Sequence, residues 1–473
     1  MSKELILNDS NSIRLPAVWE ASISVLSLIL GIGFSVGWYG LSPQIPTLLG
    51  VAVAGFIAWR CGYNWAAIEQ AMVKGVTRAV PAMMIFLLIG VLIGVWIVAG
   101  VVPSLLYYGM QILSPEVFLP ATLIICAVAS LATGSSWGTS GTIGLALIGV
   151  GGSLGFPLPV VAGAVISGAY FGDKMSPLSD TTNLASSMAG TDLYTHIRHM
   201  ANTTGIAFAL TFIIEIGLGF RYSSTSEQVD VSEILMLLER NFVIGPLMLI
   251  PPLILIVVSF KKVPPLPGLA LGIVVAAVIG IFVQGVSIDQ IMEVGYSGFL
   301  SETGVASIDD LLSRGGIASM SYTITIVLVA MMFGGIMEQT NQLKVLVAKL
   351  LERAVSTGSL VASTAFTTFA ANLVLCEQYM SVIVGARTYA EEFKARGLHA
   401  KNLSRIVEDS GTVTAPLIPW TSGAAYQAGV LGVATFAYAP FAFFCWISPL
   451  VTLAFGFLNI NITKIEADPD APG

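Results

Sequence analysis

The chain has 473 residues, of which 55% are hydrophobic and only 10% carry a charge. Soluble globular domains carry about 25% charged residues, so this composition excludes an ordinary soluble protein and predicts a polytopic α-helical membrane protein. The net charge is −7, and no basic patch stands clear of the predicted membrane flanks. We therefore expect the lipid bilayer, and no nucleic acid, as a partner.

The four cysteines are scattered and mostly lie in apolar runs, with no Cys/His spacing typical of a metal site. We therefore expect neither a disulfide framework nor a bound cofactor. Residues 1–16 are polar and do not resemble a cleavable signal peptide, so we expect a cytoplasmic N-terminus followed by a retained membrane helix.

The first predicted membrane spans cover about 17–39, 43–60, 80–99 and 117–133. Between the second and third, residues 62–79 form an amphipathic stretch with charges at Glu69, Lys74 and Arg78. An amphipathic stretch beside a span is typical of a helix that lies on the membrane surface. We predict such an interfacial helix here.

The segment 132–142, ATGSSWGTSGT, is too rich in Gly, Ser and Thr for an ordinary spanning helix. It is predicted to be a re-entrant tip or an unwound segment, although close helix packing also favours small residues. In the first reading the hydroxyls of Ser135, Ser136 and Thr139 are candidate ligands. Apolar pieces at 143–151 and 157–171 follow, and a span at 201–220 closes this half.

Residues 167–190, SGAYFGDKMSPLSDTTNLASSMAG, form a polar island between apolar runs, and Pro177 interrupts it. Charged side chains at membrane depth are costly and commonly mark an ion or substrate path. A helix broken at that depth also exposes backbone groups, which is tolerated where protein or a cavity covers them. The candidate binding residues are Asp173, Lys174, Ser176, Asp180, Thr181, Thr182 and Asn183.

The second half of the chain repeats the first. Residues 68–72 match 288–292 at an offset of 220, and 172–190 match 411–429 with seven identities at an offset of 239. An insertion around 299–317 explains the difference. The predicted units are repeat one at 17–220, an external polar connector at 221–240, repeat two at 241–460 and a cytoplasmic tail at 461–473.

The distribution of Lys and Arg predicts that the two repeats have opposite orientations. The connection 60–78 carries three basic residues, whereas its counterpart 285–317 is acidic with only Arg314 basic. The loop 100–118 has no basic residue, whereas its counterpart 339–356 has three. Because Lys and Arg gather on the cytoplasmic side, both termini are predicted to be cytoplasmic. Inverted repeats with broken helices are typical of secondary transporters.

Asp173 and Asp180 are seven residues apart, so they lie two turns apart on one helical face or flank one pocket if the helix breaks between them. Burial favours the protonated form of a carboxyl group. If Na⁺ needs the ionised form, Na⁺ and H⁺ compete for one group, and this competition couples their transport. Lys174 either pairs with one of these aspartates or acts as a titrating group or an anchor for an anionic substrate.

In the aligned second half, Thr412 takes the place of Asp173 and Pro419 that of Asp180, so hydroxyls remain where the carboxylates are lost. Glu408 and Asp409 are either further ligands or part of the cytoplasmic rim near Arg405. The candidate residues here are Asn372, Glu377, Thr412, Thr414, Thr421 and Ser422.

Two further groups of residues have a structural and a functional interpretation. His196 and His199 flank Arg198 and are interpreted as a solvated interfacial cluster rather than as a pH sensor. Trp137 and Trp420 either form walls of the site or pack against neighbouring helices.

The run GDKMSPLSDTTNLA, with GSSWGTSGT upstream, resembles the NhaC family of bacterial Na⁺/H⁺ antiporters over about 17–460. The resemblance implies a plasma-membrane secondary antiporter with inverted repeats, often dimeric. The function we expect is exchange of cytoplasmic Na⁺ for external H⁺, and the pattern of residues makes Asp173 and Asp180 the candidate Na⁺ ligands. The same family includes malate/lactate antiporters coupled to Na⁺ and H⁺, so organic-anion exchange is the alternative. A channel or an enzyme is disfavoured, because no catalytic triad, HExxH or nucleotide loop occurs.

Overall fold

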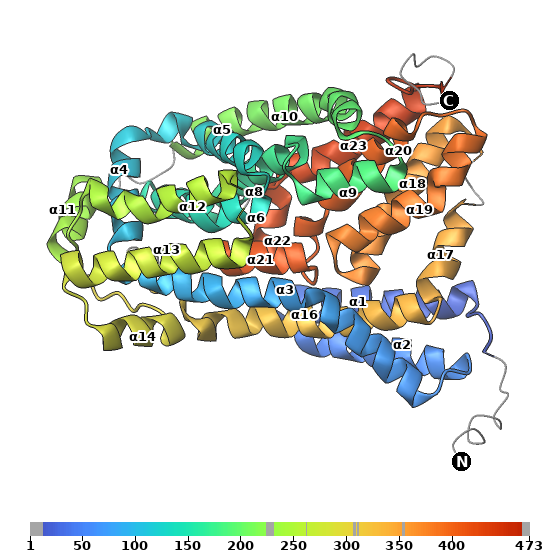
Figure 1. Ribbon diagram of the computed structural model, residues 1–473, viewed down its shortest axis with the longest axis horizontal. Coiled ribbons are helices and arrows are strands. Elements are labelled where there is room, and N and C mark those ends of the chain that lie inside the picture. Colours follow the sequence, from blue (N-terminus) through green and yellow to red (C-terminus); the bar gives the residue numbers. More distant parts are fainter. Residues whose placement is uncertain are drawn as a thin grey trace.

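The computed structural model describes residues 13–223, 231–261, 263–305, 309, 312–351 and 355–465. These residues are helical, joined by short turns, apart from one isolated bridge between Leu398 and Lys464. The long helices run roughly along the long axis of the molecule (Figure 1). Most of the expected N-terminal segment, the middle of the expected connector (224–230) and the end of the tail (466–473) lie outside the described residues.

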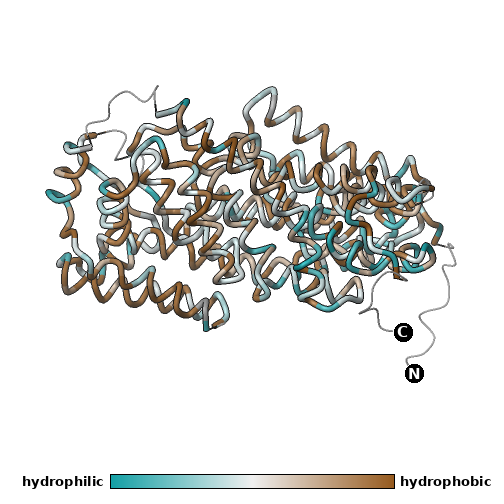
Figure 2. The backbone as a smooth tube through the Cα atoms, turned by 90° about the horizontal axis from the view of Figure 1, so that it is seen from above, coloured by the Kyte–Doolittle hydropathy of each residue, from teal (hydrophilic) through white to brown (hydrophobic). Residues whose placement is uncertain are grey.

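Within the described ranges, seven helices are long and apolar enough to cross a membrane. They are α1 (Val18–Tyr39), α3 (Trp65–Val98), α5 (Pro115–Thr133), α10 (Leu193–Ser223), α13 (Pro265–Ile279, continued by η3, Gly280–Gln284), α16 (Gly316–Gln339) and α18 (Thr357–Leu375). Two bent pairs raise the number to as many as nine: α11 (Val231–Asn241) with α12 (Ile250–Phe260), and α22 (Thr435–Tyr438) with α23 (Phe443–Leu458). Figure 2 shows long hydrophobic stretches along the backbone, with hydrophilic stretches gathered toward the side that carries the marked chain ends. The predicted polytopic α-helical membrane protein is confirmed.

The predicted interfacial helix at 62–79 is wrong, because this stretch is the first half of α3. The side chain of Asn64 caps the start of α3 by accepting a hydrogen bond from Ala67 N at 2.9 Å. The helix then continues for 34 residues with Pro81 inside it. The segment is amphipathic because its apolar face packs against α16 and does not lie on the lipid surface.

Helices α3 and α16 cross in antiparallel orientation through glycines. A Cβ on Gly75 would lie 2.0 Å from the carbonyl oxygen of Met331, and one on Gly335 would lie 2.2 Å from that of Ala71. Farther along, Gly90 meets the backbone of Gly316 in the same way. Small residues allow this close backbone approach, which supplies packing energy where the surrounding lipid offers no hydrophobic driving force.

The expected polar connector at 221–240 is partly helical. Helix α10 extends to Ser223, and α11 occupies 231–241 before the chain bends by 90° into the next apolar segment. Although α11 carries several charged residues, it is a strongly amphipathic helix. Shorter helices outside the breaks described next include α2 (Gln44–Arg60), α4 (Val101–Ile112), α14 (Ile288–Ser297), α17 (Gln342–Leu351) and η2 (Pro246–Leu249).

Four helix breaks lie in the part of the chain that forms the interior. The first separates α5 from α6 (Ser136–Thr139), η1 (Ser140–Gly144) and α7 (Leu145–Ser153), and the second separates α8 (Leu158–Met175) from α9 (Asp180–Ala189). The third separates α18 from α19 (Gln378–Ala395). The fourth separates α20 (Ala400–Val407), η4 (Glu408–Thr412) and η5 (Ala415–Leu417) from α21 (Ser422–Leu431). The unwound segments predicted near 132–142 and Pro177 are confirmed.

The caps of these breaks recur at a constant spacing of 242 residues, not 239. Left-handed C-caps recur at Gly134 and Cys376 and at Gly190 and Gly432, and side-chain N-caps recur at Ser135 and Glu377 and at Ser179 and Thr421. The predicted residue pairing is therefore wrong by three. Three residues make almost one helical turn, so small residues on one face match in either register. In the observed spacing Pro177 corresponds to Pro419, and Asp180 corresponds to Ser422.

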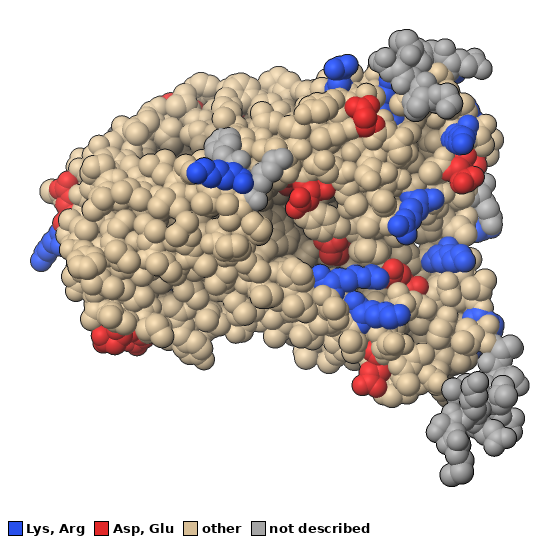
Figure 3. All heavy atoms as spheres, in the orientation of Figure 1, with Lys and Arg blue, Asp and Glu red and all other residues tan. Residues whose placement is uncertain are grey.

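Lys and Arg side chains gather on the half of the visible face that carries both described chain ends (Figures 1 and 3). Arg14 N donates to the carbonyl of Cys61, and Lys464 bridges to Leu398, so the two described ends lie beside the 60–65 and 396–400 turns.

Replacing Gly75 with Ala will destabilise the protein by about 1–3 kcal/mol, because the added methyl group meets backbone rather than a flexible side chain. Gly205→Ala in α10 is the matched control, since a Cβ there meets nothing within 4 Å and alanine favours a helix by about 1 kcal/mol. Thermal unfolding of both variants in detergent measures the difference. Equal midpoints would contradict the packing role of Gly75.

Candidate ion-binding cavity

A cavity of about 1420 Å³ lies where residues of all four helix breaks meet α3, α12 and α13. We call it the central cavity. Figure 3 shows the surface hollowed near the middle of the molecule, with acidic side chains beside the hollow. Its polar lining consists of Arg78, Thr133, Ser135, Ser136, Thr139, Thr142, Asp173, Asp180, Thr181, Asn183, Glu377, Gln378 and Ser422.

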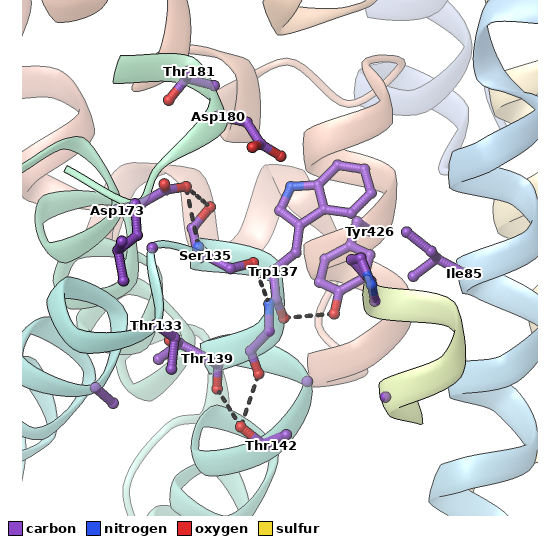
Figure 4. Close-up of a pocket in the computed structure, with 18 of the residues that line it drawn as sticks. Ile85, Thr133, Ser135, Trp137, Thr139, Thr142, Asp173, Asp180, Thr181 and Tyr426 are labelled. Carbon is purple, nitrogen blue, oxygen red and sulfur yellow. Dashed lines mark hydrogen bonds between the residues drawn. The ribbon is translucent and has the colours of Figure 1, made fainter. Parts of the chain in front are cut away.

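Asp173 lies in the last turn of α8 and is buried. Its carboxylate accepts hydrogen bonds from the backbone N–H of Ser136 at 3.0 Å and from the Ser136 hydroxyl at 2.6 Å (Figure 4). A carboxylate at the start of a helix satisfies N–H groups that have no partner within the helix. Asp173 therefore ties the end of α8 to the beginning of α6 across two breaks.

Asp180 is the first residue of α9, directly after its N-cap Ser179, and its side chain is exposed to the cavity. Asn183, one turn later, donates hydrogen bonds to the carbonyl oxygens of Pro177 at 3.0 Å and Ser179 at 2.7 Å. The amide thus satisfies backbone freed by the break, while the carboxylate of Asp180 stays available to a ligand.

The second half of the chain contributes Glu377 and Ser422 to the same cavity. Glu377 is the N-cap of α19 and accepts a hydrogen bond from Met380 N at 3.0 Å. The hydroxyls of Ser422 and Thr139 are buried and have no hydrogen-bond partner among the described residues. Such oxygens are suited to a hard cation.

Nine of the sixteen predicted binding residues line the central cavity, and seven do not. Ser176 donates to the carbonyl of Leu131 at 2.8 Å, and Thr182 donates to that of Lys174 at 3.0 Å. The second-half residues behave alike, because they bond to backbone or to one another away from the cavity: Asn372, Thr414 and Thr421, with Thr412 buried beside them. These residues lie outside the cavity lining, and their assignment as ligands stays a prediction.

Lys174 forms an ion pair with Asp409, so both proposed pairings with Asp173 or Asp180 are wrong. Neither side chain of this pair is exposed. Lys174 also donates to the hydroxyl of Ser448 at 3.0 Å, and Asp409 accepts from Thr203 at 2.9 Å and from Thr452. A buried pair is tolerated when further hydrogen bonds satisfy its remaining atoms, and here it joins α8 to the second half.

Glu408 is fully buried and does not belong to a solvated rim. One of its oxygens accepts a hydrogen bond at 3.0 Å from the hydroxyl of Thr181, which also lines the cavity. Arg405 is likewise buried and donates to the carbonyl of Asn461 at 3.0 Å. Glu408 therefore lies behind the cavity wall, and the hydroxyl of Thr181 links it to the lining.

The two histidines are buried, so the interpretation as a solvated interfacial cluster is wrong. His196 shares a hydrogen bond of 2.8 Å with the hydroxyl of Ser404, which lies in α20. The histidines are buried because α20 packs over this end of α10. The local sequence around them does not indicate that contact.

An aromatic pair forms one wall of the cavity. The rings of Trp137 and Tyr426 are stacked with centroids 4.3 Å apart, and the Tyr426 hydroxyl donates to the carbonyl of Trp137 at 2.6 Å (Figure 4). Trp420 lies outside the lining and donates to the carbonyl of Leu373 at 2.9 Å. Tyr426 was missed because an aromatic residue in an apolar helix gives no signal by itself.

Replacing Lys174 with Met will destabilise the protein by about 3–5 kcal/mol, because Asp409 would keep a buried charge without its partner. Adding Asp409→Asn to Lys174→Met removes that charge and will recover much of the loss. Thermal unfolding of the single and double variants in detergent tests this coupling. A double variant no more stable than the single one would contradict it.

The chain is similar to a family of known membrane transporters. Residues 168–460 match the Na⁺/H⁺ antiporter family. The chain is 37% identical to the Na⁺/H⁺ antiporter NhaC of Alkalihalophilus pseudofirmus, covering 95% of this chain and 98% of the relative. It is 38% identical to the malate-2H⁺/Na⁺-lactate antiporter of Bacillus subtilis, covering 94% and 95%. It is 34% identical to the arginine/ornithine antiporter ArcD of Halobacterium salinarum, covering 93% and 92%. The chain therefore belongs to the Na⁺/H⁺ antiporter family.

Proposed function

We propose that this protein is a secondary antiporter of a bacterial plasma membrane that exchanges cytoplasmic Na⁺ for external H⁺ by alternating access. Family membership supports antiport. The observation that carries the proposal is the meeting of two carboxylates, Asp173 and Asp180, from the two sides of one helix break in a cavity rich in hydroxyl oxygens.

Coupling follows from competition at these carboxylates. The carboxylate of Asp180 faces the cavity and makes no hydrogen bond or ion pair with the described residues, so it binds either Na⁺ or a proton, but not both. The hydroxyls of Thr139 and Ser422, one from each half of the chain, supply further oxygens to the same cavity. Because one site holds one ion at a time, each Na⁺ released on one side is replaced by a proton before the site returns.

The carboxylates that line the cavity and the buried Lys174–Asp409 pair have different roles. Lys174 and Asp409 neutralise each other, so they add no net charge next to the carried ion. Asp173 keeps its hydrogen bonds to Ser136 and so holds the mouth of the first break in a fixed geometry. We assign ion exchange mainly to Asp180, with Asp173 as the second Na⁺ ligand.

The recurrence of the breaks at a constant spacing supports two structural repeats whose broken helices meet at the cavity, as in many secondary transporters. The antiparallel contact between α3 and α16, which hold corresponding places in the two halves, agrees with inverted orientation. The positive-inside rule then assigns the Lys- and Arg-rich end, with both termini, to the cytoplasm.

Organic-anion exchange is the second candidate, and the size of the cavity favours it over a site for Na⁺ alone. The charges oppose it. Lys174 does not reach the cavity, and Arg78, the basic residue among its described lining, pairs with Glu338.

Replacing Asp180 with Asn will abolish Na⁺-driven proton movement. An amide does not exchange a proton near neutral pH and carries no charge for Na⁺, so the two ions no longer compete for this group. The variant will remain folded, since Asp180 is exposed to the cavity. The measurement is Na⁺-induced ΔpH in proteoliposomes. Asp192→Asn is the matched control: hydrogen bonds from Thr195 hold the pKa of Asp192 below its ordinary value, and its side chain lies outside the cavity. Wild-type ΔpH in the Asp180 variant would refute the assignment.

Na⁺ will drive proton movement in wild-type proteoliposomes that contain no organic anion. Loading malate inside and supplying lactate outside will leave the initial rate unchanged within about twofold, because Arg78, the basic residue among the described lining, is already paired with Glu338. An absolute requirement for the two anions would favour organic-anion exchange instead.

A further inference from the structure

We propose that the central cavity also binds an organic cation that has one ammonium group and an aromatic or apolar body. The inference uses the same cavity as the proposed Na⁺ site but does not require that Na⁺ be transported. It follows from the size, charge and aromatic lining of the cavity.

The cavity is larger than a Na⁺ site requires. Its volume of about 1420 Å³ exceeds the roughly 300–1,000 Å³ of ordinary small-molecule sites. A single Na⁺ with its oxygen ligands occupies only the corner near the helix breaks. The remaining space therefore fits a molecule with a body of several carbon atoms.

The charges of the lining select a cation. Asp173, Asp180 and Glu377 are acidic, and among the described lining residues Arg78 is the basic one. Arg78 is already paired with Glu338. A cation entering this lining gains attraction from carboxylates, whereas an anion meets repulsion.

The helix starts around the cavity offer an anion no compensation. Free N–H groups at a helix start are ready-made anion sites. Here the start at Ser136 is bound by Asp173, and the start of α19 is bound by Glu377, its own N-cap. The third start, that of α9, bears Asp180 as its first residue. Protein carboxylates therefore already occupy two of these starts, and Asp180 repels an anion at the third. The start of α21, whose Ser422 lines the cavity, is capped by the Thr421 hydroxyl, which accepts a hydrogen bond from Ala424 N at 3.1 Å.

The aromatic pair provides a surface for an ammonium group. Trp137 and Tyr426 both line the cavity, and Figure 4 shows Asp180 and Trp137 reaching into it from neighbouring elements. Their stacking and the hydrogen bond between Tyr426 and the Trp137 carbonyl hold both rings in place. A cation over a tryptophan face is attracted by the ring quadrupole, most strongly where water is excluded.

An apolar wall faces this charged corner. It is built by Ile85 of α3, Ile124 and Val128 of α5, and Leu255 and Leu269 of α12 and α13. A ligand that carries a charge at one end and an apolar body at the other matches both sides, whereas a small polar ion leaves this wall unused.

Three ligands of similar shape test the charge selection: benzylammonium, benzyl alcohol and phenylacetate. Equilibrium binding of radiolabelled benzylammonium to the purified full-length protein in detergent is measured near pH 7, with the other two as unlabelled competitors. We expect saturable binding that added Na⁺ weakens competitively. Benzyl alcohol and phenylacetate will compete at least tenfold more weakly.

Two variants with matched controls locate the binding site. Asp180→Asn will weaken benzylammonium binding about tenfold or more, whereas Asp192→Asn will leave it unchanged. Trp137→Leu will weaken it by about twofold to thirtyfold. Trp446→Leu is its control, because Trp446 lies outside the cavity and donates to the carbonyl of Ala439. Melting temperatures of all four variants show that a loss of binding is not a loss of folding.

Each contrary result has a distinct meaning. Equal competition by benzyl alcohol would show binding through the apolar wall alone, and tighter binding of phenylacetate would show an anion site; either result overturns the inference. Absence of benzylammonium binding in a protein that still performs Na⁺/H⁺ exchange overturns the inference and leaves the proposed function intact. Binding in a protein without Na⁺-driven ΔpH supports the inference and removes the proposed function.

Discussion

The rest of the structure depends on one constraint: a helix that breaks inside a bilayer must find partners for its freed backbone groups, because hydrocarbon offers none. The four breaks meet this demand with short polar side chains. Ser176 and Thr182 bond to carbonyls in the first half, and Asn372 and Thr421 do so in the second. Two of the hydroxyls that remain without partners among the described residues, those of Thr139 and Ser422, line the cavity where the breaks meet. The cavity is what remains after the backbone has been satisfied.

The same constraint separates two kinds of charge in the interior. Lys174 and Asp409 form a closed network with neighbouring hydroxyls, and this network fastens the first half of the chain to the second. Asp180 and Glu377 instead lie at the starts of α9 and α19, and Asp173, at the end of α8, accepts a hydrogen bond from the start of α6, where backbone N–H groups stabilise negative charge. All three line the cavity, and the side chain of Asp180 is the exposed one. Paired charge supports the structure, and charge at helix starts is available to a transported ion. Family membership alone does not divide the residues in this way, since relatives carry Na⁺, carboxylates or amino acids by name.

The packing of α3 on α16 shows how the frame around the cavity is held. Glycines bring the two backbones into contact, so the pair forms a rigid antiparallel wall. The Lys174–Asp409 pair and the glycine contacts are therefore complementary: one joins the halves by charge in the interior, and the other joins them by shape along the outer wall. The broken helices lie between these two connections, and Arg78 of α3 lines the cavity while pairing with Glu338 of α16.

The sequence by itself determined the membrane class, most of the spans, the breaks near 132–142 and Pro177, and the polar residues from which the site is built. These properties are local, because hydropathy, glycine and proline act on their own stretch of chain. It did not determine which hydroxyls face the cavity, the partner of Lys174, the burial of His196, or the register that relates Asp180 to Ser422. The last three depend on contacts or relations between segments more than 200 residues apart. Polar residues that satisfy backbone and polar residues that bind an ion look alike in sequence, and only the tertiary structure decides which way each one points.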